Sequence, residues 1–198
     1  MVHVVLRLYA DAGELISRIK EHEAEVRDLL TTVPGFRGYG LINTGAGAVS
    51  LTTCEDKAGT DESSTRAAAW VKDNMPGSSI SAPRIVEGER VYRIEARRAD
   101  DPPHVLLRVF GPEALALLRD NEAKVRELMT KVASFRAYTV IDTGAGGVSL
   151  TFADNKAGID EVASHMVPWI QSKLPGVNPV ETIEGDGVLR FVAEGLPA

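Results

Sequence analysis

The sequence predicts an α+β protein built from two copies of one βαββαβ unit, and three observations lead to this prediction. Residues 33–62 match residues 132–161 without a gap at 18 of 30 positions, which indicates an internal duplication. Strand-like and helix-like apolar patterns follow one another in the same order in both copies. Glycine-rich turns separate these patterns at matching places. We therefore expect two domains, at residues 1–96 and 104–198, joined by a polar, proline-containing linker at 97–103.

The first copy begins with a strand and a long helix. Residues 3–9 alternate between two faces, as a strand does. Residues 12–32 then place apolar side chains at helical spacing until a Pro-Gly pair ends the helix. His22 lies within this apolar stripe, and its counterpart in the second copy is Asn121. Both are polar groups directed towards the sheet, where each needs a hydrogen-bonding partner.

A hairpin follows the helix. Residues 36–43 and 48–54 are strand-like, and the glycine-rich segment 44–47 between them favours a tight turn. Alternation along residues 36–43 predicts that one face of this strand carries two glycines, which would allow a helix to pack closely against that face. That face consists of Phe36, Gly38, Gly40 and Ile42, and the opposite face of Arg37, Tyr39, Leu41 and Asn43.

A second helix and a last strand complete the copy. The helix begins near Thr60 or Asp61, ends near Met75, and is followed by a strand at 90–95. Its expected inner stripe includes Ser63, Ala67, Trp70, Val71 and Asn74. The order is that of a ferredoxin-like unit.

The second copy repeats the order. Its expected strands are 104–110, 135–142, 148–153 and 188–193, and its expected helices are 113–131 and 160–173. Pro168 lies inside the second of these helices, and we expect a kink or an early break there.

The repeated stretches carry a resemblance to a known group of proteins. PGFRGYGLINTGAGAVSLTTCEDKAG with Trp70, and ASFRAYTVIDTGAGGVSLTFADNKAG with Trp169, resemble the dimeric α/β-barrel superfamily, specifically antibiotic-biosynthesis-monooxygenase-like domains. The resemblance covers most of both copies. It implies that two tandem ferredoxin-like units form an intrachain α/β barrel, a pseudo-dimer with its helices outside.

The resemblance also implies candidate chemistry, and the sequence departs from part of it. Quinol-oxygenase members carry a Trp on the second helix with an Asn one turn earlier. Here that earlier residue is Arg66 before Trp70 and His165 before Trp169. Haem-degrading relatives need an Asn on the first strand, which neither copy has, so haem is not the expected ligand.

Composition limits the remaining function classes. The formal net charge is −6 and no basic run occurs, which disfavours nucleic acid. The sequence has neither a membrane-spanning stretch nor a signal-peptide pattern at its beginning, so the expected location is the cytoplasm. The single cysteine, Cys54, corresponds to Ala153. The four histidines lack metal-ligand spacing, so neither a metal nor another cofactor is expected.

Arginines recur on the predicted strands. They are Arg7, Arg37 and Arg93 in the first copy and Arg108, Arg136 and Arg190 in the second. Alternation predicts that all six face the barrel interior or the interface between the two halves. Buried guanidinium groups need partners, so the alternatives are ion pairs with acids such as Asp142 and Glu95, contact with solvent at the barrel mouth, or an anionic ligand held by forked donors.

Two hypotheses of function remain open. The first is a cofactor-independent monooxygenase-like enzyme that acts on a small aromatic or polyketide-type substrate. His22 or His165 would be its base, and its pocket candidates are Trp70, Trp169, Tyr39, Tyr138, Arg66 and Asn121. The second is a non-enzymatic barrel that binds a small hydrophobic ligand or has a stress-response or structural role. Association of further copies is left open.

Overall fold

The structure is a computed structural model that describes residues 1–10, 12–78, 80–97 and 101–193. Part of the predicted linker, residues 98–100, lies outside the described residues. The eight strands are hydrogen-bonded in the closed order β1-β3-β2-β8-β5-β7-β6-β4, so the predicted α+β barrel is confirmed. The chain divides into two compact units, which are described separately below.

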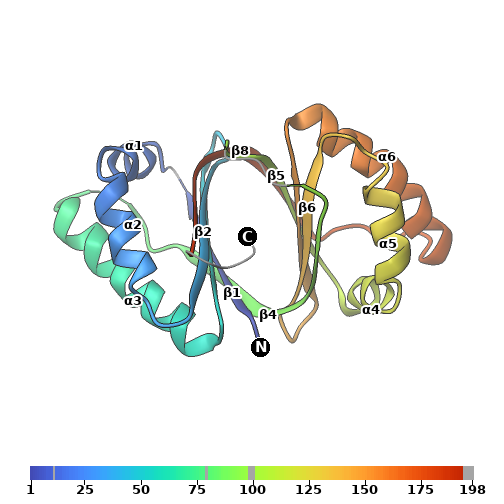
Figure 1. Cartoon of the computed structure of the whole chain (residues 1–198), viewed down its shortest axis with the longest axis horizontal. Helices are drawn as coiled ribbons and strands as arrows, with labels where there is room; N and C mark the ends of the chain where they lie inside the picture. The colour runs from blue at the N-terminus through green and yellow to red at the C-terminus, as the bar shows by residue number, and fades with distance from the viewer. Residues whose placement is uncertain (11, 79, 98–100, 194–198) are drawn as a thin grey trace. The chain divides into compact units, whose positions relative to one another are not determined.

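Unit 1 comprises residues 1–87 together with residues 187–198. Its elements are β1 (His3–Ala10), α1 (Gly13–Glu21), α2 (Glu23–Thr31), β2 (Phe36–Asn43), β3 (Gly47–Cys54), α3 (Lys57–Asn74), the start of β4 (Arg84–Glu95) and the end of β8 (Glu181–Val192). Figure 1 shows α1, α2 and α3 together on one side of strands β1 and β2. The core of the unit fills the space between these helices and the sheet.

Unit 2 comprises residues 88–186 and repeats this arrangement. It contains the rest of β4 and of β8, together with β5 (His104–Phe110), α4 (Pro112–Asp120), α5 (Glu122–Met129), β6 (Phe135–Asp142), β7 (Gly147–Ala153) and α6 (Lys156–Lys173). Helices α4, α5 and α6 lie on one side of β5 and β6 (Figure 1). A second core lies between them and the sheet.

The long helix predicted in each copy is two helices. Residues 12–32 form α1 and α2, which are separated at His22, where φ is −111° and ψ is 30°. Asn121 divides α4 from α5 with nearly the same angles. Its side-chain nitrogen donates to the carbonyl of Leu117. The two polar residues that interrupted the apolar stripe are thus the residues at which the helix changes direction.

The second helix of each copy is continuous and capped. Asp56 accepts a hydrogen bond from the Gly59 amide at the start of α3, and Asn155 accepts one from the Gly158 amide at the start of α6. Pro168 lies within α6, which continues to Lys173. The predicted early break is therefore wrong, because the helix tolerates the loss of one backbone donor on its exposed side.

A β-bulge overturns the predicted faces of β2. The register against β3 shifts between Phe36 and Gly38. The extra residue moves the alternation by one position, so Phe36, Tyr39 and Leu41 all pack in the helix-facing core. The same shift occurs between Phe135 and Ala137 of β6. The prediction that the glycines of β2 face the helices is therefore wrong.

Strands β4 and β8 are both longer than predicted. Each has 12 residues, where the sequence pattern indicated six. The boundary between the two compact units falls within each strand, after Glu87 in β4 and after Asp186 in β8. The predicted domain limits, 1–96 and 104–198, follow the two sequence repeats and stay a prediction. The compact units have other limits, because each unit contains residues of both repeats.

Candidate functional site

Unit 1 contains a small chamber between its helices and its sheet. Its apolar walls include Leu15, Ile19, Val26, Leu30, Trp70 and Val71. Its polar lining comes from Arg7, Tyr9, Tyr39 and Ser50 on the strands. The cavity has a volume of about 30 Å³, enough for one or two water molecules. We call this space the unit 1 chamber.

Arg7 is the charged residue in the lining. Its side chain lies on the helix-facing side of β1, not in the barrel interior as alternation predicted, because it bonds to residues of α3. Nη1 donates to Thr52 Oγ1 at 2.9 Å, and Nη2 donates to Ser63 Oγ at 2.8 Å and to Ser64 Oγ at 2.7 Å. Burial lowers the pKa of the guanidinium, and the nearby Tyr9 and Tyr39 oppose that shift.

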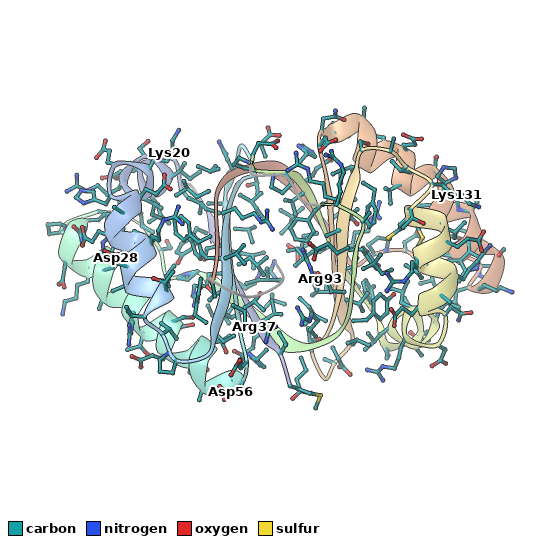
Figure 2. All side chains as sticks on the ribbon, in the orientation of Figure 1. Lys20, Asp28, Arg37, Asp56, Arg93 and Lys131 are labelled. Atoms are coloured by element: carbon teal, nitrogen blue, oxygen red, sulfur yellow. The ribbon has the colours of Figure 1, made fainter. Side chains whose placement is uncertain are left out.

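Other strand arginines behave differently. Figure 2 shows Arg37 on the face of its sheet away from the helices of unit 1, and Arg93 on the corresponding face in unit 2, as predicted. Arg136 is buried and pairs with Asp154 at 2.6 Å. The predicted face is therefore right for Arg37 and Arg93 and wrong for Arg7.

Tyrosines surround the Arg7 end of the chamber. Tyr39 stacks on Phe191 of β8, with ring centroids 5.3 Å apart. Burial raises the pKa of Tyr39 and that of Tyr9, and the Arg7 charge acts in the opposite direction on both. These hydroxyl groups therefore stay protonated at neutral pH and can donate hydrogen bonds.

His22, Glu25 and Trp70 form a cluster beside the chamber. Trp70 Nε1 donates to Glu25 Oε1 at 2.9 Å, and His22 Nδ1 lies 3.0 Å from Glu25 Oε2. The His22 and Trp70 rings form a T-shaped contact with centroids 5.9 Å apart. Trp70 lines the chamber, and His22 reaches the chamber only through Trp70.

The other candidate residues lie elsewhere. Arg66 joins α3 to the end of α2, donating to the Leu29 carbonyl at 3.1 Å and to Thr32 Oγ1 at 2.8 Å. In unit 2, Tyr138 is buried beside Tyr92, with centroids 6.3 Å apart. Trp169 and His165 are half-buried on α6, and Asn121 lies at the α4–α5 junction. The structure thus brings Tyr39 and Trp70 together in the chamber wall and places His22 against Trp70, whereas Arg66 is not part of the lining.

Comparison of the two copies identifies chamber residues that the sequence pattern of one copy alone did not single out as functional. Ala67 beside the chamber corresponds to Met166, which is 2 % exposed in the unit 2 core. Ser63 and Ser64 correspond to Val162 and Ala163. The second copy therefore places a larger side chain where the chamber lies and lacks two of the three hydroxyls that hold Arg7, whereas Thr151 matches the third, Thr52.

Alkaline pH tests the buried tyrosines. Burial raises the pKa of Tyr138 to about 12, against about 10 in an unfolded chain. Above pH 10 the unfolded chain loses the phenolic proton first, so it binds fewer protons and the free energy of unfolding must fall. We expect it to be constant to about pH 8 and to fall above that, first because burial raises the pKa of the Cys54 thiol to about 11, and then by about 2 kcal/mol or more between pH 10 and 12 because of the tyrosines. Urea unfolding at each pH measures this.

The variant Tyr138→Phe is the matched control for that titration. It removes one of the buried phenols, so its unfolding free energy should fall less steeply above pH 10. Equal slopes for the two proteins would contradict the burial of the Tyr138 hydroxyl.

Solved structures share this fold. The chain is similar to an anthrone oxidase-like protein (14% identity, 98% of this chain and 93% of that chain, TM-score 0.62). It is also similar to a "putative monooxygenase" from Lactobacillus acidophilus NCFM (12% identity, covering 96% of this chain and 95% of that chain, TM-score 0.69). A variant of chlorite dismutase from Candidatus Nitrospira defluvii matches as well (10% identity, covering 94% of this chain and 90% of that chain, TM-score 0.61).

The chain has the dimeric α/β-barrel fold. The resemblance stated from the sequence is thereby confirmed at the level of fold, and the monooxygenase-type neighbours share that fold. No protein-family model matches the sequence, and no curated protein matches it significantly.

Metal-holding clusters and membrane-crossing helices are both absent from the described residues. No group of three or more His, Cys, Asp or Glu side chains there is arranged to hold a metal ion. Within the same residues, the helices are too short or too polar to cross a membrane.

Proposed function

We propose that the unit 1 chamber is the substrate site of a cofactor-independent monooxygenase that acts on a small aromatic molecule. The observation that carries this proposal is an apolar space walled by Trp70 and Tyr39, with a buried guanidinium in its lining. Aromatic walls favour a flat apolar substrate. The guanidinium favours the substrate's anion, which is the form that reacts with oxygen. The anthrone oxidase-like neighbour supports this class of chemistry.

The proposed reaction needs no external reductant. A base removes a proton from a CH₂ group activated by an aromatic ketone or phenol, and the resulting enolate or phenolate reacts with O₂. The CH₂ becomes C=O, and the second oxygen atom leaves as water with the two hydrogens. The substrate supplies all four electrons, so that both atoms of O₂ are reduced.

The proposed roles follow from the contacts. Glu25 holds one nitrogen of His22, which leaves the other nitrogen to accept the substrate proton. Trp70 and Tyr39 would position the ring, and Arg7 would stabilise the developing oxyanion. Because the cavity is about 30 Å³, the substrate must displace wall side chains, and a turn of Trp70 would bring His22 to the ring.

Oxygen uptake with anthrone, which has such a CH₂ group, tests the proposal. We expect one O₂ consumed per CH₂ oxidised with anthrone, and a rate that His22→Asn lowers about 100-fold or more. His165→Asn removes the other candidate base, which lies on α6 in unit 2 away from the unit 1 chamber, and should retain the rate. The proposal is wrong if no substrate of this class consumes oxygen, or if His22→Asn retains full activity.

A second function is favoured by the small volume of the chamber. A packed helix–sheet space suits a barrel that binds a small hydrophobic ligand without chemistry, or one with a structural role. Saturable binding of an aromatic molecule without oxygen uptake would favour this function over the first.

A further inference from the structure

The hydrogen bonds of Arg7 leave part of its binding capacity unused. The side chain is 2 % exposed and its partners are three hydroxyl oxygens. Three of the five guanidinium N–H groups are therefore accounted for. Nε is buried and has no hydrogen-bonding partner. A donor of this kind inside a protein normally finds an acceptor.

The hydroxyl partners are held in the accepting role. Ser63 Oγ and Ser64 Oγ each donate their own proton to the Thr60 carbonyl, at 2.8 and 2.9 Å. Their lone pairs are thus directed to Nη2 of Arg7. This arrangement fixes the guanidinium at the wall of the chamber before any ligand arrives, and a fixed donor loses little entropy on binding.

The charge of Arg7 is not neutralised. No ion pair includes it in the part of the chain that the structure describes, whereas the other buried arginine, Arg136, pairs with Asp154. A buried cation without a carboxylate has lost its hydration without compensation, and an anion in contact with it recovers that cost. The surrounding Tyr9 and Ser50 supply neutral polar groups to the same wall.

We propose that Arg7 is an anion-binding subsite, and that the ligand of the unit 1 chamber is an aromatic monoanion whose carboxylate or phenolate oxygen accepts from Nε. The apolar walls would receive the ring of that ligand. This inference shares the chamber with the proposed function and names its ligand class, but it does not require oxygen chemistry.

The comparison of the two copies restricts the subsite to unit 1. Arg108 corresponds to Arg7, but Val162 and Ala163 replace the serines that hold it, and Glu184 acts electrostatically on Arg108. Met166 replaces Ala67. The second copy therefore lacks the two serine acceptors that hold the guanidinium, and a buried Met side chain stands where Ala67 adjoins the chamber.

Ligand pairs of equal shape and different charge test the subsite. Binding of benzoate and of neutral benzamide to the whole chain is measured at pH 7 by calorimetry and by Trp fluorescence. We expect benzoate to bind at least tenfold more tightly than benzamide. Arg7→Met should abolish that preference, and the matched variant Arg108→Met should retain it. Phenol should bind more tightly above pH 10, where it ionises.

A second variant keeps the test decisive if Arg7→Met does not fold. Ala67→Met introduces the side chain of the second copy and fills the chamber without changing Arg7, so binding of both ligands should be lost.

Equal affinity for benzoate and benzamide, or loss of the preference in Arg108→Met alone, would overturn the subsite. Benzoate preference without oxygen uptake would contradict only the oxygenase. Oxygen uptake without a charge preference would contradict only the subsite.

Discussion

Gly47→Ala is expected to destabilise unit 1 by more than about 4 kcal/mol, the range reached only by severe steric or core defects. Gly47 begins β3 and pairs with Ala10 at the end of β1. A Cβ at this position would overlap the backbone carbonyl oxygen of Tyr9. Backbone cannot rotate away as a flexible side chain can, so the β1–β3 pairing must separate locally.

Gly45→Ala is the matched control, and urea unfolding measures both variants. Gly45 has a φ of +77°, but open space surrounds the position of a Cβ. Its substitution should cost only the left-handed backbone strain, about 1–2 kcal/mol. Gly146 and Gly144 are the corresponding residues of the second copy. A Cβ on Gly146 would meet the Phe110 carbonyl, whereas a Cβ on Gly144 would meet nothing. Equal stability of Gly47→Ala and Gly45→Ala would show that β1 does not approach the hairpin this closely.

Trp70→Ala should cost about 3–5 kcal/mol of unfolding free energy, as for other buried Trp or Phe truncations. Trp70 is 7 % exposed and packs in the core of unit 1. The substitution also leaves Glu25 without the indole donor. The enlarged chamber would lose the aromatic wall beside His22, so aromatic ligands should bind more weakly as well.

Trp169→Ala gives the comparison for this prediction. Trp169 occupies the same place in the repeat but is half-buried, and it packs at the margin of the unit 2 core. Truncation there should cost at least about 1 kcal/mol less, because less apolar area is lost. Denaturant unfolding of the two variants at equal protein concentration measures the difference. Equal costs would contradict the different burial of the two side chains.

Part of the candidate site could be predicted from the sequence. Helical spacing placed Ser63, Ala67, Trp70 and Val71 on one stripe of α3, and this stripe faces Arg7 and the chamber. His22 was identified as a polar residue in an apolar stripe. Its position at a helix break was not predicted, because the spacing continues smoothly through the junction between α1 and α2.

The positions of Tyr39 and Arg7 depended on contacts distant in sequence. A single bulge against β3 moved Tyr39 to the helix-facing side, and a bulge leaves no mark in the alternation of β2 itself. Arg7 was placed by hydroxyls more than 40 residues away. Alternation assigns each strand residue to one of two faces, but it does not say which face the helices cover.

The sequence by itself determined the duplication, the order of the strands, and the glycine turn at Gly45 and Gly144, because these depend on local spacing and backbone conformation. Only the tertiary structure decided which residues meet: the shared strands β4 and β8, the face that carries Tyr39, and the uncompensated Arg7 beside Ser63 and Ser64. Those arrangements come from strand register and from packing between segments far apart in the chain, which local periodicity does not specify.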